Sequence, residues 1–205
     1  MYKKPVIVFE GIEGSGKTFY SNIVSKYLQK KKIQHVKFRE PGGSKNSEII
    51  RKLILDKKNN FDKNTDLLLY LAARSENIKT IRKYYKKKII LIDRFSDSTI
   101  AYQHYGLGVK LPIIKRINEY LLKDFRVNFT FLNIVNKKNM KIRLRKRKKL
   151  NRYDKFDASF YNKVQNGFRK LARNKKNYKI INSNLDIIEN EKKILGIINR
   201  LIKWI

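Results

Sequence analysis

The sequence contains no cysteine, two histidines and three prolines in 205 residues. Without cysteine, the chain forms no disulfide, holds no thiolate zinc site and has no cysteine nucleophile. The two histidines, His35 and His104, are too few for a metal site built from several imidazoles. We therefore expect any metal ion to be a hard cation on oxygen ligands, such as magnesium.

Long apolar runs are absent as well, because none approaches the ~20 residues that a membrane-spanning helix needs. The N-terminal segment starts with basic residues, but its apolar run ends at Glu10, which indicates a first strand rather than a signal peptide. We expect a cytoplasmic protein with no membrane segment. The length suits a single domain covering residues 1–205.

Acidic residues are scarce: 17 Asp and Glu stand against 50 Lys and Arg, for a formal net charge of +33. Such a charge is compatible with nucleic-acid binding. However, Lys, Asn and Ile are abundant together, as an A/T-rich coding sequence would produce. The one dense basic run, Arg143–Lys149, has no interleaved aromatic residues for base stacking. We therefore expect no nucleic-acid binding, although a positive field attracts phosphorylated substrates.

Short β-branched or apolar runs alternate with segments of helical periodicity. This alternation predicts an α/β fold with a five-stranded parallel sheet flanked by helices on both faces. Ligands of such sheets bind beyond the carboxyl ends of the strands. The predicted strands are Val6–Glu10, His35–Phe38, Ile89–Asp93, Phe129–Val135 and Tyr178–Asn182.

The longest predicted helices are Asn64–Tyr85, capped by Asn64 or Thr65, and Leu185–Ile205. Shorter helical stretches are expected around Ser98–Tyr105, Leu111–Lys123 and Asn136–Lys146. In the last helix, the inward-facing residues are expected to be Ile188, Leu195, Ile198, Leu201 and Ile202.

The first strand runs directly into a glycine-rich loop that ends in Lys-Thr. This loop fits G-x-x-x-x-G-K-[ST] at every fixed position, and it lies between a strand and a helix as a nucleotide-binding P-loop does. Lys17 would lie against the outer phosphates, and the hydroxyl of Thr18 would bind magnesium. The predicted nucleotide contacts are Gly11, Ile12, Glu13, Gly14, Ser15, Gly16, Lys17 and Thr18.

Other residues suit a second, aromatic and anionic ligand. Tyr70 and Arg74 are four residues apart and share a helix face, with small Ala72 and Ala73 between them. Asp93 ends the third strand, where it can bind magnesium through water in a nucleotide site, while the fork of Arg94 suits a phosphate. These residues predict an acceptor nucleotide rather than water as the recipient of the phosphoryl group.

Together, FEGIEGSGKT, REPGG, YLAAR and DRFSDSTIAYQ resemble the bacterial thymidylate kinases, in the same order, between Val6 and Phe168. The resemblance implies a P-loop NTPase-type three-layer fold and a homodimer that phosphorylates dTMP with ATP and Mg²⁺. It places Glu13 near the acceptor hydroxyl and the metal, and Arg39 and Arg94 at the acceptor phosphate. Ser98, Thr99, Tyr102 and Gln103 follow on the next helix: Thr99 and Gln103 approach the base, and Tyr102 lies under the sugar and disfavours a 2′-hydroxyl.

A closing lid supplies positive charge and excludes water in nucleotide kinases, and residues 143–160 are the candidate. By resemblance, Arg152 is the catalytic lid arginine and Arg143 packs on adenine. The sequence departs from the family at Asn151, where the family has Asp, and at Phe156, which replaces an acid.

The sequence therefore predicts a dTMP kinase whose catalytic residues are Lys17, Arg94, Arg152 and Glu13. A deoxynucleoside kinase is the nearest alternative, with Glu10 or Glu13 as the base, and another nucleoside monophosphate kinase is a further one. A P-loop protein that uses ATP as a switch for nucleic-acid binding is the alternative from another class.

Overall fold

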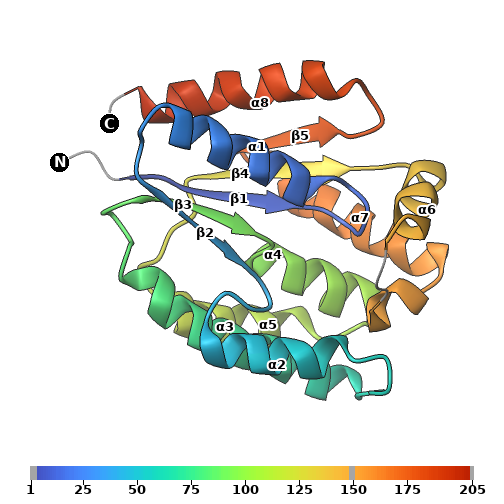
Figure 1. Cartoon of the computed structure of the whole chain (residues 1–205). Coiled ribbons are helices and arrows are strands. Elements are labelled where there is room, and N and C mark those ends of the chain that lie inside the picture. The colour runs from blue at the N-terminus through green and yellow to red at the C-terminus, as the bar shows by residue number, and fades with distance from the viewer. Residues whose placement is uncertain (1–3, 148–150, 204–205) are drawn as a thin grey trace.

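The computed structural model describes residues 4–147 and 151–203 and forms three layers, helices on either side of one sheet (Figure 1). The five strands are all parallel in the order β2-β3-β1-β4-β5. This confirms the predicted α/β fold. The strands are β1 (Val6–Glu10), β2 (His35–Arg39), β3 (Ile89–Asp93), β4 (Phe129–Ile134) and β5 (Tyr178–Asn182).

One face of the sheet is covered by α1 (Lys17–Lys30) and α8 (Ile187–Ile202) (Figure 1). Alternate residues of the central strands point toward these helices, so that Ile7 and Phe9 pack with Val24 and Ile194. The intervening residues Val6 and Val8 join the core of the opposite face. Burial on both faces explains why the central strands read as continuous apolar runs.

The opposite face carries most of the remaining helices. These are α2 (Lys45–Leu55), α3 (Lys63–Arg82), α4 (Ser96–Thr99), α5 (Leu111–Leu122) and α7 (Ala158–Ala172). The sequence patterns did not predict α7, and α6 (Lys137–Arg145) lies at the end of the sheet where β4 finishes (Figure 1). None of the described helices combines the length and apolar character that crossing a membrane requires.

Two details of the helices differ from the prediction. The cap of α3 is Asp62, whose carboxylate accepts a hydrogen bond from the backbone N–H of Asn64 at 2.8 Å, so neither Asn64 nor Thr65 is the cap. In α8, Ile188 was expected to face inward but is 63% exposed. Six residues separate it from buried Ile194, a rotation that places it about 120° from the packing face.

Helix α4 continues as a π-helical turn over Ile100–Gly106. Sequence periodicity predicts a helix here, but it cannot predict the wider winding of this turn. π-Helical turns are rare and occur mostly at functional sites. This one carries Tyr102 and Gln103, both buried, toward the carboxyl ends of the strands.

Candidate active site

The phosphate loop connects β1 to α1 and depends on backbone conformations that favour glycine. Gly11 has φ +141°, and a Cβ at this position would lie 2.3 Å from the carbonyl oxygen of Asn133. Gly16 has φ +86° and precedes the first residue of α1. The loop thus leaves its backbone N–H groups and the N-terminus of α1 without intervening side chains, an arrangement suited to phosphate oxygens.

Lys17 lies beneath this loop and is 6% exposed. Its Nζ donates a hydrogen bond to the carbonyl oxygen of Ile12 at 3.3 Å. Burial, together with the nearby positive charge of Arg94, lowers the pKa of Lys17 to about 8. A polyphosphate bound against Lys17 would favour its charged form.

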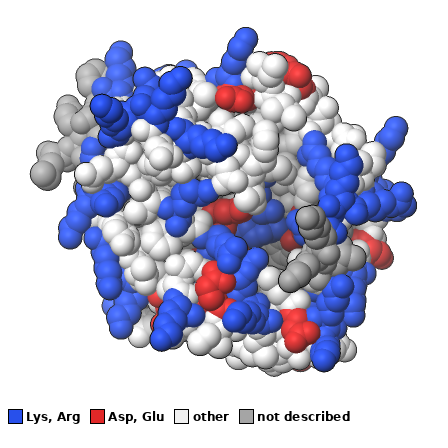
Figure 2. All heavy atoms as spheres, in the orientation of Figure 1, with Lys and Arg blue, Asp and Glu red and all other residues white. Residues whose placement is uncertain are grey.

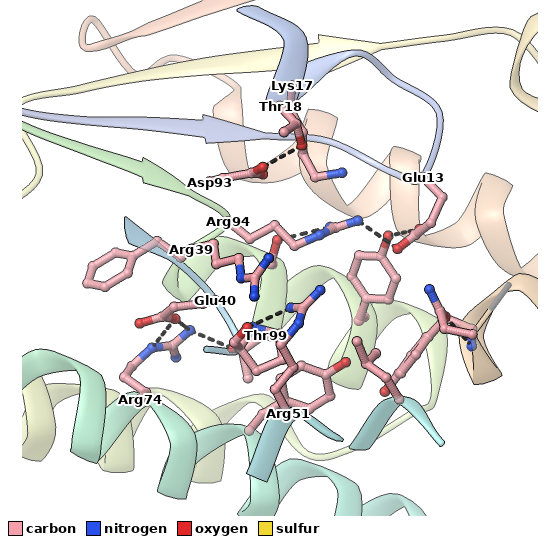
Figure 3. A pocket seen from close by; sticks show the side chains of 18 of the residues that line it. Glu13, Lys17, Thr18, Arg39, Glu40, Arg51, Arg74, Asp93, Arg94 and Thr99 are labelled. Carbon is pink, nitrogen blue, oxygen red and sulfur yellow. Dashed lines mark hydrogen bonds and ion pairs between the residues drawn. The ribbon is translucent and has the colours of Figure 1, made fainter. Parts of the chain in front are cut away.

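Thr18 lies in the first turn of α1 and Asp93 ends β3, and their side chains point toward each other (Figure 3). The hydroxyl of Thr18 donates a hydrogen bond to Oδ2 of Asp93, while Oδ1 of Asp93 is buried with no hydrogen-bond partner among the described residues. A hydroxyl and a carboxylate are oxygen ligands of the kind that Mg²⁺ binds. The pair therefore fits a magnesium ion.

Arg94 follows Asp93 and adopts φ +67°. Its guanidinium donates to the carbonyl oxygen of Gly11 at 2.9 Å and to Glu13 at 2.7 Å, and it lies 5.0 Å from the ring centroid of Tyr102. The left-handed backbone turns this side chain off the end of β3 toward the phosphate loop (Figure 3).

Glu13 is the acidic member of the phosphate loop and is 8% exposed. Burial acts to raise the pKa of this carboxyl, but Arg94 and Lys17 outweigh it and hold the pKa below its ordinary value. The hydroxyl of Tyr102 donates a further hydrogen bond to it. Glu13 is therefore held ionised between two cations.

A cavity of about 270 Å³ opens in front of these groups. All nine residues that the sequence assigns to dTMP binding line it, from four different segments of the chain. They are Glu13, Arg39, Tyr70, Arg74, Arg94, Ser98, Thr99, Tyr102 and Gln103.

The wall of the cavity includes a side-chain amide that has no partner among the described residues. Gln103 is 1% exposed, and neither its side-chain oxygen nor its nitrogen has a hydrogen-bond partner in the described part of the chain. Two unpaired polar atoms in a buried site are costly unless a ligand satisfies them. A pyrimidine ring edge, which offers both a donor and an acceptor, matches this amide.

The family model described as thymidylate kinase matches residues 9–194. The chain belongs to the thymidylate kinase family. Members of this family phosphorylate dTMP, so the chain is a nucleotide-binding phosphotransferase of dTTP biosynthesis.

Individual relatives agree with the family match. The thymidylate kinase of a Wolbachia from Brugia malayi is 36% identical over 95% of this chain and 94% of its own length. That of Thermosipho africanus is 34% identical over 95% and 97%. The crystal structure of the Ehrlichia chaffeensis thymidylate kinase superposes with a TM-score of 0.77 at 30% identity, covering 97% of this chain and 99% of that one.

In this thymidylate kinase, Arg74 is buried and tied to the protein rather than solvated. It donates to Glu40 at 2.6 and 2.9 Å, to Thr99 at 2.9 Å and to Asn118 at 2.6 Å. Thr99 thus holds Arg74 at the cavity wall. A direct contact between Arg74 and the thymine ring remains a prediction.

Ser98 lines the cavity but also binds a buried carboxylate behind it. Its hydroxyl donates to Glu10 at 2.5 Å, and Glu10 also accepts from the backbone N–H of Phe95 at 2.9 Å. Burial, followed by the nearby charge of Asp97, raises the pKa of Glu10 to about 8. Glu10 lines a separate cavity of about 370 Å³, so of the two candidate bases only Glu13 faces the acceptor cavity.

The arginines around the cavity differ in how firmly they are held. Arg39 pairs with Glu48 at 2.9 Å and keeps 54% of its side chain exposed. The sequence analysis missed Arg51, which lines the cavity and donates to the carbonyl oxygen of Pro41 at 2.6 Å. The available signal for Arg51 was its position on the helix directly after REPGG, the segment that the sequence already assigns to the acceptor site.

The lid segment is partly described, since residues 148–150 lie outside the described ranges. Arg143 donates to the carbonyl oxygens of Gly14 at 2.9 Å and Ser183 at 2.7 Å, which places it against the phosphate loop. Arg152 binds Asp66 and is not among the residues that line the cavity. Arg147 does line it and was missed; it lies two residues beyond the end of α6, so helical spacing from Arg143 gives no signal for it.

Proposed function

We propose that this thymidylate kinase uses ATP as the phosphoryl donor and Mg²⁺ as its metal ion. The observation that carries the proposal is the junction of two sites: Lys17 and Thr18 of the phosphate loop open into the same cavity as Tyr70 and Gln103. Two nucleotides would meet there end to end, with Arg94 between their phosphates.

In the proposed reaction, an oxygen of the dTMP phosphate attacks the γ-phosphorus of ATP in line, and the bond to the β-γ bridging oxygen breaks. The acceptor oxygen is already ionised at neutral pH, so no general base is needed. Lys17 and Arg94 neutralise the transferred group. Arg152, which pairs with Asp66 in this structure, would leave that partner to join them when the lid closes over the donor. Magnesium, when bound, would be held by Thr18 and Asp93 and would neutralise charge on the donor phosphates.

The proposed acceptor contacts follow from the cavity. Tyr70 stacks on thymine, while Gln103 and the Arg74–Thr99 pair lie at the ring edge. The ring of Tyr102 lies under the sugar, where it leaves no room for a 2′-hydroxyl. Arg39 contacts the acceptor phosphate, and Arg143 lies beside the adenine of ATP.

The arrangement of Glu13 favours a monophosphate acceptor over a nucleoside. A deoxynucleoside kinase needs a carboxylate that takes a proton from a sugar hydroxyl. Glu13 is bound by Arg94 at 2.7 Å and by Tyr102, and its lowered pKa makes it a weak base. These observations favour dTMP, because its phosphate would engage the arginines directly.

Two further properties are part of the proposal. A homodimer is expected, with α2 and α3 as the candidate interface, since both carry large exposed apolar side chains. The cytoplasmic location and the absence of nucleic-acid binding remain predictions from the sequence.

The test is an assay of ADP formation with ATP, Mg²⁺ and a panel of acceptors. We expect strong preference for dTMP, little turnover of AMP, CMP or GMP, and loss of activity when magnesium is chelated. Preference for thymidine would identify a deoxynucleoside kinase. Preference for another monophosphate would contradict the roles given to Tyr70, Arg74 and Thr99.

A further inference from the structure

Asp66 is a buried acid that the reaction does not use. It lies in the first turn of α3 and is 3% exposed. Its Oδ1 accepts a hydrogen bond from the guanidinium of Arg152, and its Oδ2 accepts one from the hydroxyl of Tyr153 at 2.7 Å. Both partners belong to the 3₁₀ turn Arg152–Lys155, so one carboxylate joins α3 to the lid segment.

The ring of Tyr153 forms part of the acceptor cavity. It is 2% exposed and meets two other tyrosine rings edge-on, Tyr70 at 6.0 Å and Tyr102 at 5.8 Å between centroids. Those two rings are the proposed contacts for thymine and deoxyribose. Tyr153 therefore packs directly against both of them.

The lid turn is built to present Tyr153 in one orientation. The side chain of Asn151 accepts from the backbone N–H of Tyr153 at 2.8 Å, and Asp154 accepts from the N–H of Asn151 at 2.7 Å. Phe156 stacks on Phe160 with centroids 4.0 Å apart. Asn151 and Phe156, the two departures from the family pattern, thus fix the turn.

Resting on the proposed function, we propose that Asp66 is a positioning residue for the acceptor nucleotide. Its carboxylate holds Tyr153 against Tyr70 and Tyr102, and so makes the lid segment a wall of the dTMP site. The guanidinium of Arg152 supplies the opposite charge that a buried carboxylate requires. Loss of this link would free the wall and weaken dTMP binding, while the ATP site on the phosphate loop stays intact.

The experiment measures dTMP binding and ATP-analogue binding separately by calorimetry, with steady-state kinetics on the same proteins. Wild type is compared with Asp66→Ala, Asp66→Asn, Tyr153→Phe and the double variant Asp66→Ala with Tyr153→Phe. The matched control is Glu76→Ala. Glu76 is an acid on the same helix as Asp66, but it accepts a hydrogen bond from Asn46 instead of binding the lid segment. Circular dichroism and the melting temperature report the fold.

We expect Asp66→Ala to weaken dTMP binding about tenfold or more, with the affinity for the ATP analogue unchanged. Asp66→Asn keeps an acceptor for the Tyr153 hydroxyl, so it should recover part of the affinity. Tyr153→Phe should weaken dTMP binding too, and it should add nothing to the effect of Asp66→Ala, because Asp66→Ala already removes the bond to the Tyr153 hydroxyl. Glu76→Ala should bind dTMP as wild type does.

The outcomes separate this inference from the function on which it rests. If wild type binds no dTMP and forms no ADP with it, the proposed function is wrong. If wild type is active but the folded Asp66 variants bind dTMP normally, or lose both nucleotides equally, Asp66 has a structural role only and the inference is overturned. Should Asp66→Ala not fold, Asp66→Asn and Tyr153→Phe decide the question in the same way.

Discussion

Arg94 combines a structural and a chemical role in a single side chain. It neutralises Glu13 at 2.7 Å, where both side chains are largely buried, and it points at the place where the two nucleotides would meet. A buried ion pair of this kind is costly to break from one side, because the remaining charge has no partner. Stability and activity should therefore respond differently to substitutions of the two partners.

We predict that Arg94→Ala lowers kcat about 10²–10³-fold and destabilises the protein by about 3–5 kcal/mol. Adding Glu13→Gln should restore much of the stability, because it removes the unpaired carboxylate, but should leave the activity lost. Urea unfolding and ADP formation check the two effects. Recovered activity in the double variant would show that Arg94 acts only by pairing with Glu13.

Glu10 should impose a pH dependence on stability. Its pKa is about 8 in the folded chain and near 4.5 when unfolded, so the folded state holds the extra proton between these values. The stabilisation from this group is thus fully present below pH 4.5 and is lost as the pH rises toward 8.

We predict that the stability of wild type relative to Glu10→Gln falls between pH 4.5 and 8, by at most about 1.4 kcal/mol per pH unit. The amide keeps an oxygen that accepts from the backbone N–H groups of Phe95 and Ser98, but it does not titrate. Urea unfolding of both proteins at several pH values isolates this one group. Parallel stability curves would contradict the prediction.

At the scale of helices and strands, the sequence predicts those features that are determined by residues close together in the chain. The five strands and the phosphate loop are visible because an apolar run and a glycine pattern are local signals. The pairing of Asp66 with Arg152 spans 86 residues and has no local signature. Helix α7 was missed because its first turn falls within residues 143–160, which were assigned to the lid. Its apolar residues Phe160, Tyr161 and Phe168 nevertheless recur at helical spacing and bury it against the core.

Replacing either of two helical glycines, Gly167 or Gly196, with alanine should have opposite effects on the stability of the protein. A Cβ on Gly167 of α7 would lie 2.4 Å from Cδ2 and 2.8 Å from Cβ of Tyr105, in the contact between α7 and the π-helical turn. A Cβ on Gly196 of α8 would meet no atom of the described chain within 4 Å.

We predict that Gly167→Ala destabilises the protein by about 1–3 kcal/mol through overpacking, whereas Gly196→Ala stabilises it by about 0.5–1 kcal/mol through helix propensity. Thermal and urea unfolding of the two variants provide the measurement, each serving as the control for the other. A stabilised Gly167→Ala would mean that α7 can move away from the π-helical turn at little cost.

For the molecule as a whole, the charge is unevenly distributed. Lys and Arg cover much of the face shown in Figure 2, and Asp and Glu are few there. Several of the 17 acids are buried around the active site, among them Glu10, Glu13, Glu40 and Asp66. The outer surface is consequently left with a large excess of cations, which would attract both anionic nucleotides toward the cavity.

The proposed homodimer makes a last prediction. Ile49 and Leu53 lie one turn apart on α2 and are 61% and 45% exposed, and Leu68 on the adjacent α3 is 59% exposed. Apolar side chains clustered on neighbouring helices are typical of a protein interface. We expect size-exclusion chromatography with light scattering to give twice the mass of one chain, and Ile49→Asp with Leu53→Asp to give the monomer.

The same two helices carry Arg51, Tyr70 and Arg74 to the acceptor cavity, so dissociation should also raise the KM for dTMP more than the KM for ATP. The matched control is Ile187→Asp with Ile188→Asp on α8, which are 51% and 63% exposed on the other side of the sheet. It should remain dimeric and active. A monomeric wild type at micromolar concentration would contradict the proposed homodimer. Dissociation by the α8 pair instead would place the interface on α8.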